Sequence, residues 1–347
     1  MTLETQIQER SSVFFEESAF GFQRLAGKRQ VLWITDQHIY DTNNLFFEGR
    51  EVMVLPAGEA TKNFQQLEEI LLRLQTIGAD KQTVLAVAGG GMVSDIAGLA
   101  AALYMRGIET VYLPTSVLAM VDAALGGKTA INFGGIKNLL GVIRQPSAVI
   151  IDTGWLKTLP DSEWRNGLAE VIKHGCIREP GILQVLHHHN LETMQTDTAW
   201  LQQLIRSAVT VKWEVVAQDP HEKGMRKILN FGHTVGHAVE AETGIPHGQA
   251  VAVGMVYALH LSALEYGLDA AFIDSVLSLL HRYRLPVKTD VPFETLWKAI
   301  LFDKKKQDGQ LAYILLEVPG KAIIRYFELD ELRTKLEAIH NQMCGAV

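Results

Sequence analysis

Short apolar runs that alternate with amphipathic helical segments occupy residues 1–150 of this 347-residue chain. Each run has the length and the β-branched content of a buried strand. Strands that alternate with helices favour a mostly parallel sheet with helices on both of its faces. The predicted strands are Val31–Thr35, Val52–Leu55, Val84–Ala88, Val111–Leu113 and Ala148–Ile151.

Two helices are predicted between these strands. Thr61 is expected to cap the first, whose apolar residues recur at helical spacing and which ends at Gly78. The second helix is expected to run from Val93 to Met105.

The pattern changes after about Asp152 and becomes mainly helical. A small hairpin is the exception, with Pro319–Gly320 at its turn between strands at Leu311–Leu316 and Ala322–Tyr326. We therefore predict an α/β domain over 1–152, a mainly α-helical domain over 153–347, and an active site in the groove between them. The predicted helices are roughly 161–175, 180–190, 197–218, 227–243, 248–267, 270–284 and 292–303.

Composition limits the class of protein. A hydrophobic content of 48% and a charged content of 20% are typical of a soluble globular protein, and the net charge of −7 argues against a general nucleic-acid binder. No window of 18 residues is purely apolar, which argues against a membrane span. The first residues lack a basic region followed by an apolar run, so we expect no signal peptide and a cytosolic protein.

A glycine triplet, Gly89–Gly91, separates a predicted strand from a predicted helix. Glycines at this position let backbone N–H groups approach a phosphate at a helix N-terminus, although a tight turn explains them equally well. Asp95 is expected in the first turn of the helix, where it could cap the turn or accept hydrogen bonds from a ribose or a nicotinamide.

Charged residues farther along allow two interpretations each. Lys128 and Lys137 lie beside glycine pairs, as in an anion site, but solvated loop lysines look the same in sequence. Glu170 and Lys173 are one helical turn apart, which suits a structural ion pair, yet Glu170 is also a carboxylate that could join histidines at a metal. Lys304–Lys306 is expected to be a solvated charge run.

The segment from Arg226 to His247 concentrates three histidines. His233 and His237 are four residues apart, so on a helix both imidazoles would face one side, and spacing alone makes them the predicted metal pair. The glutamate of the H-E-x-x-H pattern is absent, which argues against a metalloprotease. His247 is expected to open the next helix, and a catalytic zinc commonly takes three protein ligands. The run His187–His189 is expected at the surface.

With these residues assembled, the sequence resembles the sugar-phosphate cyclase family, and within it the 3-dehydroquinate synthases of the shikimate pathway. The matching motifs run in order through most of the chain: Gly58-Glu59-x-x-Lys62, Gly89-Gly-Gly-x-x-x-Asp95, Tyr104-Met-Arg-Gly107, Pro114-Thr-Ser116, Asp122-x5-Lys128, Gly135-x-Lys-Asn138, Leu156-Lys-Thr-Leu-Pro160, Gly167-x-x-Glu170-x-x-Lys173, Arg226-x3-Asn-x2-His-x3-His237, His247-Gly and Asp303-Lys-Lys305.

This resemblance implies a Rossmann-like NAD-binding domain, a helical metal-binding domain and a homodimer. The implied ligands of Zn²⁺ or Co²⁺ are Glu170, His233 and His247, so that His237 becomes a substrate-side residue and the spacing-based pair is replaced. Arg106 is implied to reach the substrate phosphate across the dimer interface. The implied NAD contacts are Asp36, Glu59, Lys62, Gly91, Met92, Val93, Ser94, Asp95, Thr115, Ser116, Lys128, Lys137 and Thr158. The implied substrate contacts are Asp122, Lys128, Asn138, Lys173, Lys212, Arg226, Asn230, His237, Lys304 and Lys305.

The implied reaction converts 3-deoxy-D-arabino-heptulosonate 7-phosphate to 3-dehydroquinate and phosphate. It proceeds by transient oxidation with NAD, phosphate elimination, re-reduction and an intramolecular aldol closure. Related cyclases that form 2-deoxy-scyllo-inosose or valiolone depart around Gly126–Gly127, Arg226, Asn230 and His237, where this sequence keeps the dehydroquinate-type residues. An NAD-dependent alcohol dehydrogenase of the glycerol-dehydrogenase kind and a non-catalytic nucleotide-binding protein are the alternatives.

Overall fold

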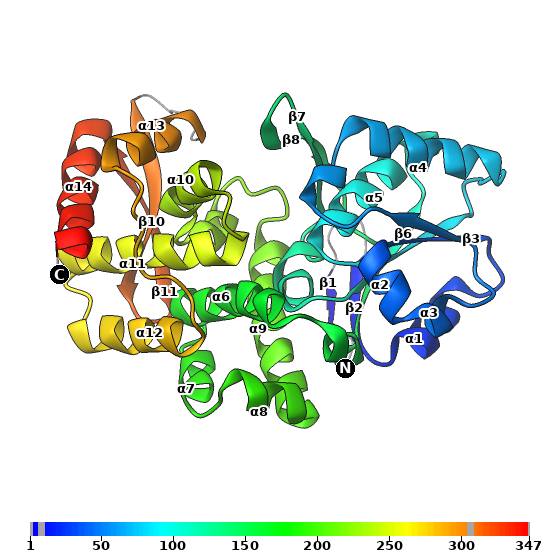
Figure 1. Cartoon of the computed structure of the whole chain (residues 1–347), viewed down its shortest axis with the longest axis horizontal. Coiled ribbons are helices and arrows are strands. Elements are labelled where there is room, and N and C mark those ends of the chain that lie inside the picture. Colours follow the sequence, from blue (N-terminus) through cyan, green and yellow to red (C-terminus); the bar gives the residue numbers. More distant parts are fainter. Residues whose placement is uncertain (1–2, 6–10, 304–308, 346–347) are drawn as a thin grey trace. The chain divides into compact units, whose positions relative to one another are not determined.

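The chain forms two compact units (Figure 1), seen in a computed structural model that describes residues 3–5, 11–303 and 309–345. The first unit contains Met1–Pro160 together with Lys212–His221, and the second contains Asp161–Val211 and Glu222–Val347. Among the helices of the described residues, none combines the length and apolar character needed to cross a membrane.

The first unit is built on a seven-stranded sheet in the order β1-β2-β9-β6-β5-β3-β4. All neighbouring strands are parallel except β1, which pairs antiparallel with β2. The five predicted strands are confirmed, whereas β1 and β2 were not predicted. The strands are β1 (Leu3–Thr5), β2 (Ser11–Phe15), β3 (Val31–Asp36), β4 (Val52–Leu55), β5 (Val84–Gly89), β6 (Glu109–Pro114) and β9 (Ala148–Ile151).

Helices cover both faces of this sheet, with α1 (Ser18–Ala26), α2 (Gln37–Thr42) and α3 (Asn44–Phe47) on one face and α4 (Phe64–Thr76) and α5 (Gly91–Leu103) on the other (Figure 1). The chain leaves β3 toward β4 and leaves β5 toward β6, which are opposite directions across the sheet. The carboxyl ends of β3 and β5 therefore flank the topological switch point, where open α/β sheets bind their ligands.

Two helix boundaries in this unit differ from the prediction. Asn63, and not Thr61, caps α4: its side-chain oxygen accepts a hydrogen bond from the Gln66 N–H at 2.9 Å, while Thr61 lies in a short 3₁₀ turn, η1 (Glu59–Thr61). Helix α5 begins two residues before Val93 and ends at Leu103, because Met105 adopts a φ of 48° that no α-helix accommodates.

The glycine-rich region after β6 contains regular secondary structure, although its lysines could also be interpreted from the sequence as loop residues. It contains a π-helical turn, η3 (Ala119–Ala123), and an antiparallel hairpin of β7 (Lys128–Phe133) and β8 (Ile136–Ile143). Gly134 and Gly135, with φ of 60° and 81°, make the turn of this hairpin.

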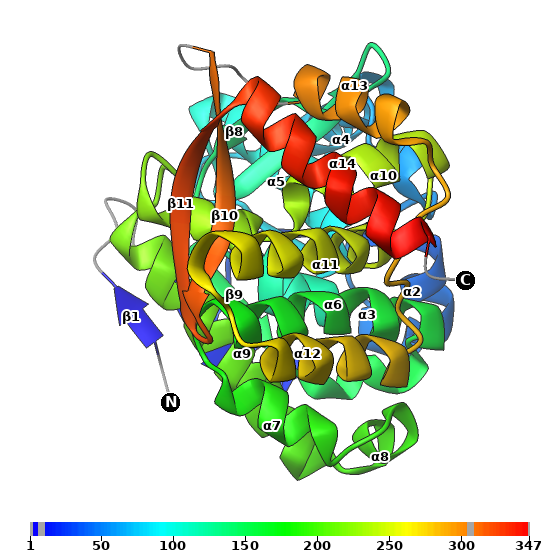
Figure 2. The same cartoon turned by 90° about the vertical axis from the view of Figure 1, so that its left-hand side faces the viewer.

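The second unit is organised around α11 (His247–Tyr266), which packs against α6, α10, α12, α14 and β10 (Figure 2). Its side chains are apolar around most of its circumference, as expected of a helix enclosed on all sides. The predicted hairpin is confirmed, whereas α8 and α14 were not predicted. The other elements are α6 (Asp161–Ile177), α7 (Gly181–His187), α8 (Leu191–Thr196), α9 (Thr198–Gln218), α10 (His233–Thr243), α12 (Ala270–Arg282), α13 (Phe293–Asp303), β10 (Gln310–Val318), β11 (Lys321–Glu328) and α14 (Leu329–Gly345).

The single helix predicted over 227–243 is wrong. The chain forms a 3₁₀ turn, η5 (Met225–Asn230), and then starts α10 at His233. Gly232 separates the two elements because its φ of 79° is left-handed and ends the first turn. With this correction, the predicted fold class of an α/β domain followed by a mainly helical domain is confirmed.

Candidate functional site

The glycine triplet of the first unit forms the connection from β5 to α5. Gly90 is the N-cap of α5 and offers no side chain to cap the helix, so the N–H groups of the first turn face outward from the strand end. A Cβ on Gly89 would lie 2.6 Å from the Val93 Cβ, which explains the glycine by packing. A Cβ on Gly90 would meet nothing closer than the Ser116 Oγ at 3.7 Å. Backbone amides at a helix N-terminus with this open space suit a phosphate.

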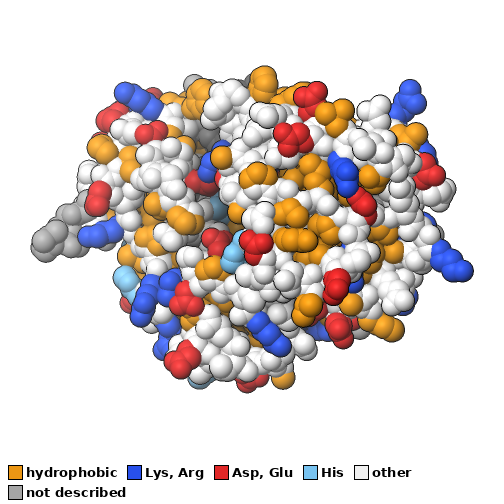
Figure 3. Space-filling view, turned by 45° about the vertical axis from the view of Figure 1, so that its right-hand side comes forward, with side chains coloured by type: hydrophobic (Ala, Val, Ile, Leu, Met, Phe, Trp, Pro, Cys, Tyr) orange, Lys and Arg blue, Asp and Glu red, His pale blue; other side chains and the backbone are white. Residues whose placement is uncertain are grey.

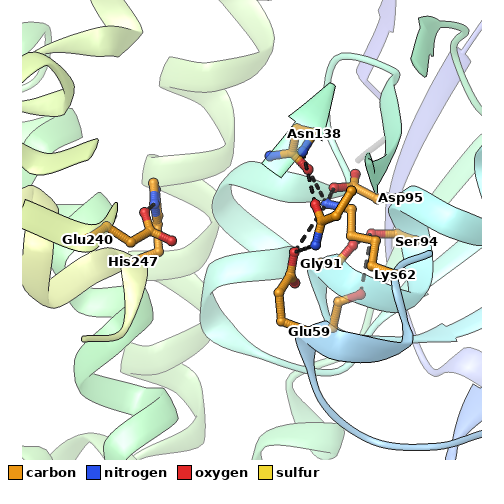
Figure 4. Close-up of polar contacts among 10 residues, drawn as sticks. Glu59, Lys62, Gly91, Ser94, Asp95, Asn138, Glu240 and His247 are labelled. Carbon is orange, nitrogen blue, oxygen red and sulfur yellow. Dashed lines mark hydrogen bonds and ion pairs between the residues drawn. The ribbon is translucent and has the colours of Figure 1, made fainter. Parts of the chain in front are cut away.

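Four residues that the sequence assigned to NAD or to the substrate form one polar network in the first unit (Figure 4). The buried Lys62 Nζ lies 2.5 Å from Asp95 Oδ2, donates to Asn138 Oδ1 and is 3.8 Å from Glu59 Oε1. Asn132 completes the network, since its amide donates to Glu59 Oε1 at 2.9 Å and its Oδ1 accepts from the Asn138 N–H at 2.9 Å. Lys62 is thus fixed at the side of the glycine-rich loop.

Burial of Asp95 raises its pKa from 3.8 to about 6, and the nearby Lys62 cation offsets part of that rise. The carboxyl group is therefore close to half-protonated in mildly acidic solution and ionised at neutral pH. The expected place of Asp95 in the first turn of the helix is wrong, because α5 begins at Gly91 and Asp95 is its fifth residue. An ionised carboxylate there still accepts hydrogen bonds from hydroxyl or amide donors of a ligand.

Several of the remaining predicted NAD residues lie at or after the carboxyl ends of strands. Asp36 ends β3, but its Oδ1 accepts the Ile39 N–H at 3.0 Å as the N-cap of α2. Thr115 and Ser116 are buried directly after β6, and Thr158 ends η4 (Thr153–Thr158) after β9. Lys137 is exposed on β8. Asp36, Thr115 and Ser116 thus lie at the edge of the sheet where its ligands are expected.

The predicted substrate residues of the first unit include one close pair. Lys212 Nζ, in the C-terminal half of α9, donates to Asp122 Oδ1 of the π-helical turn at 2.6 Å. Lys128 begins β7 with an exposed side chain. Arg106 is exposed and has a φ of 60°, next to Gly107. Lys304 and Lys305 lie outside the described residues.

A potential metal centre lies entirely within the second unit. The side chains of Glu170, His233 and His247 each present a ligand atom, and these atoms lie within 4.8 Å of one another. Nε2 of His233 is 3.9 Å from Glu170 Oε1, and Nε2 of His247 is 3.7 Å from the same oxygen. Ligand atoms of a tetrahedral zinc lie about 3.4 Å apart, given zinc–ligand distances of about 2.0–2.2 Å, so a small contraction would complete the site.

The chemistry of these donors fits a divalent cation. Both carboxylate oxygens of Glu170 are fully buried and lack a hydrogen-bond partner among the described residues, although Lys173 forms an ion pair with one of them. Burial, followed by the positive charge of Lys173, lowers the pKa of His233 well below its usual value. His233 is therefore a neutral imidazole at pH 7, which is the form that binds metals.

Three predicted substrate residues lie in the same segment of the chain as the two histidines of this group. The His237 ring lies 5.2 Å from the His233 ring and 5.9 Å from the His247 ring, so it is close to the three ligand atoms without belonging to them. Arg226 is buried in η5, and Asn230 ends that turn with its amide donating to Glu222 Oε1 at 2.8 Å.

Three side chains at these sites were missed by the sequence analysis. Asn132 sits in a strand that was not predicted. Asn166 accepts a hydrogen bond from the Gly248 N–H at 2.5 Å, and nothing in the sequence connects residues so far apart. Glu240 contacts His247, and here a signal existed, because His233, His237 and Glu240 recur at the i, i+4, i+7 spacing of one helix face.

One face of the molecule carries side chains of both charges. On the face drawn in Figure 3, Lys and Arg side chains are interspersed with Asp and Glu side chains and form no continuous basic patch, in keeping with the net charge of −7.

Comparison with known proteins gives a consistent result. Residues 52–166 match the family described as 3-dehydroquinate synthase N-terminal, and residues 167–306 match 3-dehydroquinate synthase C-terminal. The chain is 44% identical over 280 residues to a 3-dehydroquinate synthase from Xanthomonas oryzae, which covers 78% of this chain and 76% of that protein.

Two solved cyclases share the fold at lower identity. A 2-epi-5-epi-valiolone synthase from Streptomyces hygroscopicus, with NAD⁺ and Zn²⁺ bound, superposes with a TM-score of 0.88 at 26% identity and covers 96% of this chain and 97% of its own. A 2-deoxy-scyllo-inosose synthase, complexed with carbaglucose-6-phosphate, NAD⁺ and Co²⁺, gives 0.81 at 25% identity and covers 98% and 100%. The chain belongs to the 3-dehydroquinate synthase family.

Proposed function

We propose that this chain converts 3-deoxy-D-arabino-heptulosonate 7-phosphate to 3-dehydroquinate and phosphate, with NAD and a divalent metal as cofactors. The observation that carries the proposal is the group of Glu170, His233 and His247, of which the first two are buried, with ligand atoms within 4.8 Å of one another in a chain of this family. NAD, when bound, supplies the reversible oxidation of the substrate ring. The metal, when bound, polarises the hydroxyl and carbonyl groups that are interconverted.

The glycine-rich loop and the network around Lys62 are proposed to hold NAD. The first turn of α5 offers backbone amides for the pyrophosphate, and the Asp95 carboxylate, on the same helix after that turn, offers a hydrogen-bond acceptor. Lys62 has less than a tenth of its surface exposed, so it fixes the orientation of both Asp95 and Asn138 and does not act as a free surface charge.

The substrate carries a dianionic phosphate and a carboxylate, and each requires cationic or hydrogen-bonding partners. Lys173 and Arg226 are buried in the second unit, where a charge is retained only if it has a partner or a ligand. Lys212 is held by Asp122 in the first unit. We assign these three cations, with Asn230 and His237, to the recognition of the substrate and to proton transfer.

We further propose a homodimer in the cytosol, in which Arg106 contacts the substrate phosphate of the partner. Strand β8 is exposed along its whole length and carries Leu139, Leu140, Val142 and Ile143, an apolar surface of the kind that subunit contacts cover.

An experiment with two substrates distinguishes this activity from that of an alcohol dehydrogenase with the same fold. The protein, zinc and NAD⁺ are mixed with the heptulosonate phosphate in one sample and with glycerol in another. We expect phosphate release in the first and no NADH accumulation in the second. NADH accumulation with glycerol, without phosphate release from the sugar phosphate, would contradict the proposal.

A further inference from the structure

His247 is held by a carboxylate on the side of its ring that faces away from Glu170. Its Nδ1 lies 3.0 Å from Glu240 Oε2 on α10 (Figure 4), while its Nε2 lies 3.7 Å from Glu170 Oε1 on α6. Glu240 is mostly buried, with 13% of its side chain exposed, so this contact is not a solvated surface pair.

The contact sets the tautomer of His247. An ionised carboxylate can only accept a hydrogen bond, so the proton of the neutral imidazole resides on Nδ1 and the Nε2 lone pair points toward Glu170. His233 has the same arrangement through a different partner, because its Nδ1 lies 3.1 Å from the backbone oxygen of Phe231. Both histidines thus present Nε2 to one carboxylate.

A second contact fixes the backbone beneath His247. The Asn166 side-chain oxygen accepts the Gly248 N–H at 2.5 Å, and Asn166 lies one helical turn before Glu170 on α6. A Cβ on Gly248 would lie 2.0 Å from the Asn166 backbone oxygen, so only glycine allows this approach. The start of α11 is therefore attached to the helix that carries Glu170, and the Glu240 contact acts on the rotation of the ring.

We propose that Glu240 is a positioning residue for the metal centre, which holds His247 as an Nε2 ligand. This proposal rests on the proposed function only in that Glu170, His233 and His247 bind the metal. Carboxylates that accept from the non-ligating nitrogen of a metal-bound histidine orient the ring and increase its basicity, and their loss typically weakens metal affinity about 10–100-fold.

The test measures zinc affinity of the metal-stripped full-length chain by competition with a chromophoric chelator, together with the visible absorption of the Co²⁺ form. Glu240→Ala is expected to weaken zinc binding about 10–100-fold and to change the Co²⁺ spectrum. Glu240→Gln keeps an oxygen that accepts the same hydrogen bond, so its affinity is expected between those of the wild type and Glu240→Ala. Glu242→Ala, an exposed glutamate of the same helix, is the matched control and is expected to leave both readouts unchanged.

Thermal unfolding of the metal-free proteins separates positioning from folding. We expect the metal-free variants to unfold at the same temperature as the metal-free wild type, because the contact orients one ring. Wild-type zinc affinity and an unchanged Co²⁺ spectrum in Glu240→Ala would overturn the proposal. Phosphate release is measured on the wild type alone, so a wild type that binds zinc but releases no phosphate would reject the proposed function and leave the role of Glu240 intact.

Discussion

The backbone oxygen of Gly232 lies so close to Gly254 that a Cβ on Gly254 would be 1.8 Å from it. Gly232 directly precedes His233, so this contact between the start of α10 and α11 also positions the first histidine of the proposed metal centre. We expect Gly254→Ala to destabilise the protein by about 1–3 kcal/mol or more, since neither backbone can move without separating the helices. Thermal or denaturant unfolding measures this loss.

Gly90→Ala is the matched control, because the new methyl group would meet only the Ser116 Oγ at 3.7 Å. Its free energy of unfolding is expected to stay near that of the wild type, while NAD binding weakens because the methyl group occupies the space beside the first turn of α5. Equal destabilisation by the two substitutions would contradict the prediction that the close contact between Gly232 and Gly254 makes Gly254→Ala the more destabilising change.

Replacement of the two helical histidines should have different effects on the metal. His233→Ala removes one of the three ligand atoms and is expected to abolish metal binding and activity together. His237→Ala is expected to retain the metal and lose activity. Metal content measured by mass spectrometry, beside phosphate release, distinguishes them. Retained zinc in the first variant or lost zinc in the second would contradict the ligand assignment.

The pKa of Asp95 should respond to Lys62. The folded-state pKa of about 6 lies above the usual 3.8, so the folded protein binds this proton more tightly than the unfolded chain does. The contribution of Asp95 to stability therefore falls as the pH rises from about 4 to about 6, and it is constant above that window. Lys62→Met removes a cation that lowers this pKa, so we expect the pKa to rise above 6.

Carbon-13 NMR of the labelled Asp95 carboxyl group measures that shift directly. Lys28→Met is the control, because Lys28 is exposed in the same unit. An Asp95 pKa that is equal in Lys62→Met and in the control would contradict the ion pair.

The parallel sheet could be predicted largely from the sequence. Strands β3, β4, β5, β6 and β9 are apolar runs and could be recognised without context, whereas β2 has only Val13, Phe14 and Phe15 as an apolar signal. The β7–β8 hairpin was missed because glycines and lysines interrupt its apolar pattern. The break at Gly232 was missed because helical periodicity continues through the glycine, and only its φ of 79° shows the interruption.

Sequence patterns alone did not identify the residues of the proposed metal centre. Helical spacing selected His233 and His237, yet the fold groups His247 with His233 and Glu170, after the chain turns at Gly244 between α10 and α11. Glu170 is far from both histidines in sequence, so its assignment depended on resemblance to a known family. Lys62, Asp95 and Asn138 were each predicted as ligand contacts, but their mutual hydrogen bonds follow only from the fold.

Removal of the metal should abolish turnover without unfolding the protein. The proposed ligands lie on helices that pack together through buried apolar side chains, and this packing does not depend on the metal. After treatment with a chelator, we expect no phosphate release, and we expect zinc or cobalt to restore it. Circular dichroism monitors folding in the same samples. Phosphate release at the original rate from verified metal-free protein would contradict a catalytic role for the metal.

The most direct test of the proposed function counts phosphate released per NAD supplied, with the heptulosonate phosphate in large excess over NAD⁺. A cyclase regenerates NAD⁺ within each turnover, so we predict many phosphates per NAD⁺ and no accumulation of NADH in the absorption spectrum. Phosphate release that stops at the amount of NAD⁺ added, with matching NADH, would contradict the account.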